Sequence, residues 1–106
     1  MKYRIELIPK AQKDYKKLDR SKKKLVNKKI DELSEKPFIG EKLGNKNNID
    51  LTGFYKIYVA KKSIRIVYRL LSPKKIEVIE IWGIGKREKE EIYRIIGQRL
   101  QELKDS

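Results

Sequence analysis

The chain has 106 residues, of which 28 are Lys or Arg and 15 are Asp or Glu, so its formal net charge is +13. The length predicts one domain over residues 1–106, and the absence of Cys and His excludes disulfides, zinc–thiolate sites and a histidine general base. Charges at the N-terminus and the lack of an apolar run of about 18 residues predict a soluble cytoplasmic protein that does not enter a membrane.

The first third of the chain predicts a strand followed by two helices. Residues 3–8 alternate apolar and polar side chains, as a short strand does, and Pro9 suits the first turn of a helix. Apolar residues at helical spacing continue this helix to about Arg20. Ser21 is the predicted N-cap of a second helix that runs to about Lys36. Two consecutive helices predict a helical hairpin.

The rest of the chain predicts three strands and a last helix. Pro37 ends the hairpin, and residues 40–48 have the composition of a loop. Strand-like runs with short connections, which favour an antiparallel meander, follow at residues 54–60, 63–71 and 76–82. A helix is expected after Gly83-Ile84-Gly85. The order β-α-α-β-β-β-α predicts an α+β domain in which the two-helix hairpin packs on a four-stranded, mostly antiparallel sheet, with a C-terminal helix.

The positive charge is concentrated at the front of the chain. Residues 1–30 hold 12 cations and 3 anions, a net charge of +9, whereas the remaining residues contribute +4. A protein with this charge favours polyanions, so RNA, DNA and an acidic protein are candidate partners. The alternative is that the lysines only form a solvated surface. The candidate RNA-binding residues of this segment are Lys13, Lys16, Lys17, Lys22, Lys23 and Lys24.

The hairpin between the second and third predicted strands fixes a register. A short loop around Lys61 and Lys62 pairs residues whose numbers sum to 123, which places Tyr58 opposite Arg65. One face is then apolar, with Tyr55, Ile57, Val59, Ile64, Ile66, Tyr68 and Leu70. The other face is cationic and aromatic, with Phe54, Lys56, Tyr58, Arg65, Val67 and Arg69. It is either an ordinary wet sheet face or a binding surface for an anion.

Cations also stand where the last helix is predicted to begin. Lys86 and Arg87 follow Gly83 and Gly85, at the helix end where the macrodipole favours anions. Helix-terminal N–H groups beside two cations would form a phosphate-sized pocket. The alternative is a solvated helix start whose cost is offset by the glutamates that follow.

Two stretches of the sequence resemble the RelE superfamily of bacterial and archaeal toxins. The first is Phe54-Tyr55-Lys56-Ile57-Tyr58 with Ile64-Arg65-Ile66-Val67-Tyr68, and the second is Gly85-Lys86-Arg87-Glu88-Lys89-Glu90-Glu91-Ile92-Tyr93. The element order over nearly the whole chain is similar too. The resemblance implies a toxin that enters the ribosomal A site and cuts mRNA there, silenced by a co-expressed antitoxin.

The resemblance assigns four residues to a catalytic site: Lys56, Arg65, Arg87 and Tyr93. Tyr58 and Lys86 are further candidates, and close relatives carry a second Lys at the position of Tyr58. Cleavage by the 2′-hydroxyl of the RNA requires no metal and no cofactor, and none is expected. A Lys among cations is expected to have a disfavoured ammonium form and to act as a base, the arginines to stabilise the phosphorane, and the tyrosines to stack on a base or orient the ribose.

Two alternatives concern partners. A ParE-like protein would keep the fold and inhibit DNA gyrase by protein contact, without nuclease activity. The cognate antitoxin is expected to be acidic and amphipathic, and to cover part of an apolar stripe on the last helix; otherwise the stripe packs wholly on the sheet. The stripe consists of Ile92, Ile96, Leu100 and Leu103.

Overall fold

The computed structural model describes residues 3–46, 49–61, 63–71, 78–86 and 91–105. Within these residues, three helices and five strands form an α+β fold, as the sequence predicts, with one strand more than expected. The elements in chain order are β1 (Arg4–Leu7), α1 (Pro9–Lys16), α2 (Arg20–Glu35), β2 (Glu41–Lys46), β3 (Ile49–Val59), β4 (Ile64–Leu71), β5 (Val78–Lys86) and α3 (Glu91–Asp105).

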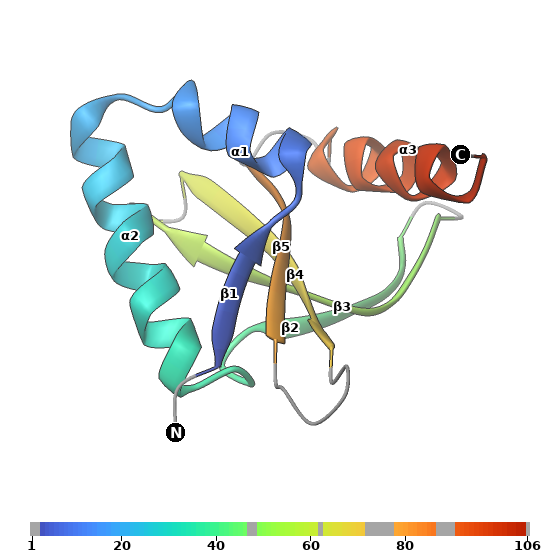
Figure 1. The fold of residues 1–106 in the computed structure, drawn as a ribbon, viewed down its shortest axis with the longest axis horizontal. Coiled ribbons are helices and arrows are strands. Elements are labelled where there is room, and N and C mark those ends of the chain that lie inside the picture. Colours follow the sequence, from blue (N-terminus) through green and yellow to red (C-terminus); the bar gives the residue numbers. More distant parts are fainter. Residues whose placement is uncertain (1–2, 47–48, 62, 72–77, 87–90, 106) are drawn as a thin grey trace.

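The described strands form one sheet in the order β1-β5-β4-β3-β2 (Figure 1). Strands β2 to β5 pair antiparallel, and β1 pairs parallel with β5. Tyr58 lies opposite Arg65, so the register predicted for the β3–β4 hairpin is confirmed.

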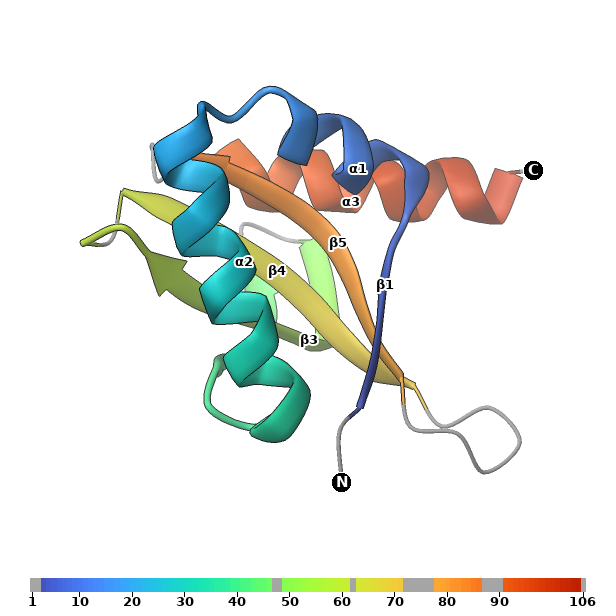
Figure 2. The same cartoon turned by 60° about the vertical axis from the view of Figure 1, so that its left-hand side comes forward.

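The helices cover both faces of the sheet. Figure 2 shows α2 in front of the sheet and α3 behind it. The first core cluster joins α1 and α2 to the predicted apolar face, including Ile66 and Tyr68. The second cluster joins α3 to the opposite face, where Phe54, Val67 and Trp82 are buried. The cationic and aromatic face is therefore not simply wet, because α3 covers part of it.

The first two helices are shifted slightly from their predicted bounds. Pro9 begins α1, as expected, but α1 ends at Lys16 rather than near Arg20. Asp19, not Ser21, caps α2, because its side chain accepts a hydrogen bond from the backbone N–H of Lys22 at 2.9 Å. Ser21 instead donates its hydroxyl proton to Asp19.

Strand β2 lies where the sequence predicts a loop. It pairs antiparallel with β3, which begins at Ile49 rather than Phe54, and its ladder is irregular between Lys42 and Gly44. Gly44 has a φ of +64° at that irregularity, a conformation that glycine adopts readily. Over residues 41–45 of this strand, Leu43 is the only buried residue. An edge strand of mostly polar residues does not show the alternation that marks a half-buried strand.

Gly83, Gly85 and Lys86 belong to β5, so Lys86 does not lie at the start of the last helix, where the sequence predicts it. The β4–β5 ladder is irregular between Val67 and Tyr68, and the described part of α3 spans Glu91–Asp105. A Cβ on Gly83 would lie 2.6 Å from Ile96 Cδ1, and one on Gly85 would lie 3.3 Å from Ile92 Cδ1. The glycines therefore let α3 pack closely on the backbone of β5.

Candidate active site

Four of the predicted site residues meet on the sheet face that α3 covers. Lys56 and Tyr58 come from β3, Arg65 comes from β4 opposite Tyr58, and Tyr93 comes from the first turn of α3. Alternation along the two strands puts the first three side chains on one face. We call these four residues the Arg65 cluster.

Arg65 lies between two tyrosine rings. Its Cζ is 5.3 Å from the ring centroid of Tyr58 and 4.7 Å from that of Tyr93. The residue is 5% exposed, and its Nη2 donates to the Tyr58 hydroxyl at 3.4 Å. Among the described residues, no acceptor pairs with its buried Nε and Nη1. Buried guanidinium groups normally have their N–H groups paired, so this arrangement has unused donors that suit an anion.

Arg69 provides a contrast on the same face of the same strand. Its Cζ also lies over two rings, 5.6 Å from Phe54 and 4.7 Å from Trp82. Its Nε, however, donates to Glu80 Oε1 at 2.7 Å. The charge of Arg69 is thus matched by a carboxylate within the fold, whereas the described residues offer Arg65 only the phenol of Tyr58.

Lys56 and Tyr58 form the polar edge of the cluster. Lys56 Nζ donates to the Tyr58 hydroxyl at 3.1 Å. Burial lowers the pKa of Lys56, but the hydrogen bond to Tyr58 and the nearby Tyr93 phenol outweigh it and raise the pKa above its ordinary value. Lys56 is therefore an ammonium at neutral pH, and the expectation that neighbouring cations make it a base is wrong. The acceptors beside its ammonium are the Tyr58 hydroxyl and, at 3.7 Å, the exposed Glu41 carboxylate.

Tyr58 has the opposite shift. The hydrogen bond from Lys56 lowers the pKa of its phenol most, and the charges of Arg65 and Lys56 lower it further, whereas burial raises it less strongly. The net pKa is below the ordinary value for tyrosine. A phenol in such surroundings gives up its proton more easily than a free tyrosine does.

Tyr93 is more deeply buried than a base-stacking residue can be. It is 1% exposed, and one face of its ring is covered by Arg65. Its hydroxyl is buried and has no hydrogen-bond partner within the described part of the chain. In this arrangement Tyr93 holds Arg65 in place and does not offer an open ring face to a nucleotide.

The remaining sequence candidates are only partly placed. Arg87 lies outside the described residues. Lys86 ends β5 opposite Ile64, and its side chain is not described. The six lysines of the front segment lie on and between α1 and α2, and Lys13, Lys16, Lys17 and Lys24 are exposed. Figure 2 shows the α1–α2 corner at the same end of the molecule as the β3–β4 turn and the start of α3.

An ion pair that the sequence analysis missed fixes α3 to the sheet. Arg99 Nη1 donates to Asp14 Oδ2 at 2.8 Å and to the carbonyl of Trp82 at 2.7 Å. Asp14 also accepts from the backbone N–H of Ile84 at 3.1 Å. Both side chains are largely buried. The pair links α1, β5 and α3 and so helps to position Tyr93, but its partners are 85 residues apart and no local pattern reveals it.

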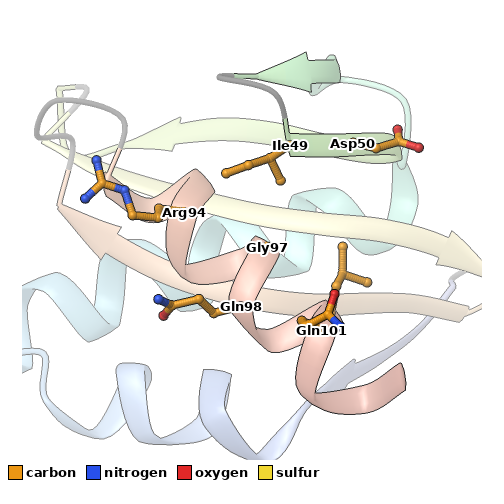
Figure 3. Close-up of a pocket in the computed structure, with 7 residues that line it drawn as sticks. Ile49, Asp50, Arg94, Gly97, Gln98 and Gln101 are labelled. Carbon is orange, nitrogen blue, oxygen red and sulfur yellow. The ribbon is translucent and has the colours of Figure 1, made fainter. Parts of the chain in front are cut away.

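A surface depression lies between α3 and the beginning of β3, away from the Arg65 cluster (Figure 3). Gly97 is essential to its shape, because a Cβ there would lie 2.9 Å from Ile49 Cγ2. Asp50, Gln98 and Gln101 surround this contact with exposed polar groups. The depression is thus a seam where α3 meets the sheet.

The apolar stripe of α3 divides into two parts. Ile92 and Ile96 are 4% and 0% exposed and pack on the sheet, whereas Leu100 is half-buried and Leu103 is 58% exposed. A stripe packed wholly on the sheet is therefore excluded, and the end of α3 presents apolar surface. In the described part of the chain, no helix is long and apolar enough to cross a bilayer. The same residues hold no group of three or more acidic side chains that could bind a metal ion.

A family model and a curated relative each match most of the chain. A family model described as the ParE-like toxin of type II bacterial toxin–antitoxin systems matches residues 5–96. A RelE-like toxin protein of Escherichia coli is 26% identical over 102 residues, which are 95% of this chain and 100% of that relative.

Solved structures of E. coli proteins are also similar to this chain over most of its length. A free variant of the E. coli toxin RelE has a TM-score of 0.70, with 26% identity over 93% of this chain and 98% of its own. A chain of the intact E. coli RelBE toxin–antitoxin complex has a TM-score of 0.66, with 27% identity over 82% of this chain and 99% of its own.

Proposed function

The chain belongs to the ParE-like toxin family of type II bacterial toxin–antitoxin systems, in the RelE branch of the RelE/ParE superfamily, and on that premise we propose that it is a metal-independent endoribonuclease that cleaves mRNA in the ribosomal A site. The observation that carries the proposal is the buried guanidinium of Arg65, whose Nε and Nη1 are unpaired among the described residues. A protein that inhibits gyrase by surface contact does not need such a buried anion site.

The proposed reaction uses the 2′-hydroxyl of the RNA as the nucleophile. The bond from the 2′-oxygen to phosphorus forms and the bond from phosphorus to the 5′-oxygen breaks, so one proton leaves the hydroxyl and one reaches the departing oxygen. Arg65 and the Lys56 ammonium stabilise the negative phosphorane oxygens, where donors fixed in advance are most effective. Because Lys56 remains protonated, the hydroxyl proton passes to solvent and Tyr58 supplies the proton to the 5′-oxygen.

Arg87 is proposed as a second phosphoryl donor, from the resemblance of the Gly85-Lys86-Arg87-Glu88 stretch. Arg87→Ala is expected to lower cleavage on programmed ribosomes by about 10²–10³-fold, the typical cost of one lost transition-state donor. Primer extension on mRNA from a translation extract measures this loss for the wild-type and variant proteins.

The same experiment tests the function itself. The wild-type protein should produce codon-phased cuts in translated mRNA and leave DNA supercoiling unchanged. Intact mRNA together with gyrase-linked DNA breaks would contradict the proposal and favour the ParE-like alternative. Cleavage by Arg87→Ala at the wild-type rate would remove Arg87 from the site without affecting the assignment of Arg65.

We also propose that the front lysines bind ribosomal RNA phosphates without taking part in the chemistry. Neutralising Lys16, Lys17, Lys22 and Lys24 to Gln should weaken ribosome binding and flatten its salt dependence, by about one unit of slope for each lost phosphate contact. Cosedimentation with ribosomes over a range of KCl concentrations measures the slope. If the slope is unchanged, this surface faces solvent on the ribosome.

A cognate antitoxin is the other proposed partner. Relatives from E. coli are known as a toxin–antitoxin complex and as a toxin bound to an antitoxin peptide. In this chain, exposed Leu103 and half-buried Leu100 extend the apolar stripe of α3 beyond the sheet. An acidic, amphipathic antitoxin segment fits this surface, because its apolar side would cover the leucines and its charge would oppose the net positive charge of the chain.

A further inference from the structure

A basic groove borders the Arg65 cluster on the side of α2. It runs between α2 and the β3–β4 turn and is lined by Leu25, Lys28, Lys29, Glu32, Tyr58, Val59, Ala60 and Lys61. Three ammonium groups and one carboxylate give this lining a formal charge of +2. Lys29 Nζ pairs with Glu32 at 3.1 Å, so the excess charge corresponds to Lys28 and Lys61.

Tyr58 connects the groove to the cluster. Tyr58 is one of the residues that line the groove, and its hydroxyl, on the face that α3 covers, accepts hydrogen bonds from Lys56 and Arg65. A strand of RNA whose scissile phosphate lies on Arg65 would reach the groove by passing around the sheet edge at Tyr58, just beyond Lys56, where the pairing of β2 with β3 ends. Neither the six front lysines nor the three cluster residues other than Tyr58 contribute to this groove.

The turn that forms one wall of the groove has an unusual backbone. Ala60 and Lys61 have φ angles of +53° and +55°, a left-handed conformation that costs free energy for residues with a Cβ. Glycine would adopt it without that cost. Such strain is found preferentially at functional positions, and here it fixes the turn that holds Lys61 beside α2.

The groove also has an apolar side. Leu25 is 44% exposed, although it projects from a helix whose other apolar residues, such as Val26 and Leu33, are fully buried. An apolar side chain among lysines suits a nucleotide, which presents a flat base beside a charged phosphate.

We propose that this groove is a second RNA subsite, which binds the phosphates of single-stranded nucleotides next to the scissile one and places a base against Leu25. The inference rests on the proposed ribonuclease function, which makes RNA the ligand of the Arg65 cluster. It adds a binding surface for the nucleotides next to the scissile phosphate. An acidic protein segment is the competing occupant, but the shared Tyr58 favours RNA because one continuous strand can occupy both places.

The test measures binding to RNA that cannot be cut. In 2′-O-methyl RNA the attacking hydroxyl is blocked, so affinity is read by fluorescence anisotropy without any contribution from cleavage. Oligonucleotides of about 3 and about 9 nucleotides bracket the length that one site and two sites would need. The proteins compared are the wild type, Lys28→Gln/Lys61→Gln, and the control Lys36→Gln/Lys42→Gln, which removes the same charge from exposed positions outside the groove.

The groove variant should bind the long oligonucleotide about tenfold more weakly and lower its salt slope by about 1.4, or about 0.7 for each lost single-strand phosphate contact. Its affinity for the short oligonucleotide should stay at the level of the control variant. Equal losses for both lengths, or an unchanged slope for the long one, would overturn the proposal. Wild-type RNA binding combined with loss of antitoxin binding would identify an antitoxin surface instead.

Failure of the subsite proposal and failure of the proposed nuclease function give different results. Length-dependent RNA binding through Lys28 and Lys61 in a protein that leaves translated mRNA intact would keep the subsite and reject the nuclease. Codon-phased cleavage with no length dependence would keep the nuclease and reject the subsite.

Discussion

Arg65→Met should abolish cleavage while leaving the free energy of unfolding unchanged or higher. Methionine keeps an apolar chain between the Tyr58 and Tyr93 rings but removes a buried charge that no described carboxylate matches. Replacing buried charged groups by apolar ones of similar volume is often neutral or stabilising. The cleavage rate should fall by about 10²–10³-fold, because a charge-assisted donor to the phosphorane is lost. Single-turnover cleavage and urea unfolding measure the two effects.

Arg69→Met is the matched control, because Arg69 shares the strand, the face and the stacking of Arg65 but has Glu80 as its partner. Removing Arg69 leaves the largely buried Glu80 carboxylate with the indole N–H of Trp82 as its one remaining partner among the described residues. The variant should be destabilised by about 1–3 kcal/mol and should cleave at nearly the wild-type rate once folded. Arg65→Met should thus lower activity without lowering stability, and Arg69→Met should lower stability without lowering activity.

If Arg65→Met does not fold, a second variant, Arg65→Lys, tests the same prediction. Arg65→Lys keeps the charge but loses the planar fork of donors, so it should fold and still be slow. Wild-type cleavage by either folded Arg65 variant would refute the assignment of the anion site.

The local parts of the site could be predicted from the sequence. The β3–β4 turn is short, so its register follows from hydrophobic alternation, and that register places Tyr58 opposite Arg65. Lys56 shares the face by the same alternation. These residues lie within ten positions of one another, and no distant contact is needed to bring them together.

The other parts depend on distant contacts. The irregular β4–β5 ladder continues through Gly83 and Gly85, which lie under Ile96 and Ile92 of α3. Strand β2 cannot be predicted from its own residues, because its pairing with β3 is what makes it a strand. The burial of Tyr93 follows from α3 docking through Arg99, whose carboxylate partner is in α1. Composition and periodicity report local preferences, so they do not contain these contacts.

The charge states of the Arg65 cluster could not be predicted from the sequence either. The sequence places several cations together and suggests that Lys56 loses its proton easily. The side chains instead arrange so that a phenol oxygen receives donors from both Lys56 and Arg65. The result is a protonated Lys56 and a more acidic Tyr58.

Tyr58→Phe should lower the cleavage rate by about 10²–10⁴-fold, the usual contribution of a positioned proton donor. The ring stays between Lys56 and Arg65, so substrate binding and folding should be nearly unchanged, and the loss should appear in the single-turnover rate at saturating ribosomes. Tyr55→Phe, in the same strand but stacked on Tyr68 on the opposite face, is the control and should cleave normally.

The pH dependence distinguishes proton donation by Tyr58 from a structural role. A donor must be protonated, so the wild-type rate should fall as the pH rises through the pKa of Tyr58, which its hydrogen bond from Lys56 places below the ordinary tyrosine value. Tyr58→Phe should lose this alkaline limb and give a low rate that does not decline there. Tyr58→Lys restores a donor at the position and should recover most of the activity. If Tyr58→Phe keeps the alkaline limb at full rate, another group delivers the proton and Tyr58 serves only to hold Lys56 and Arg65.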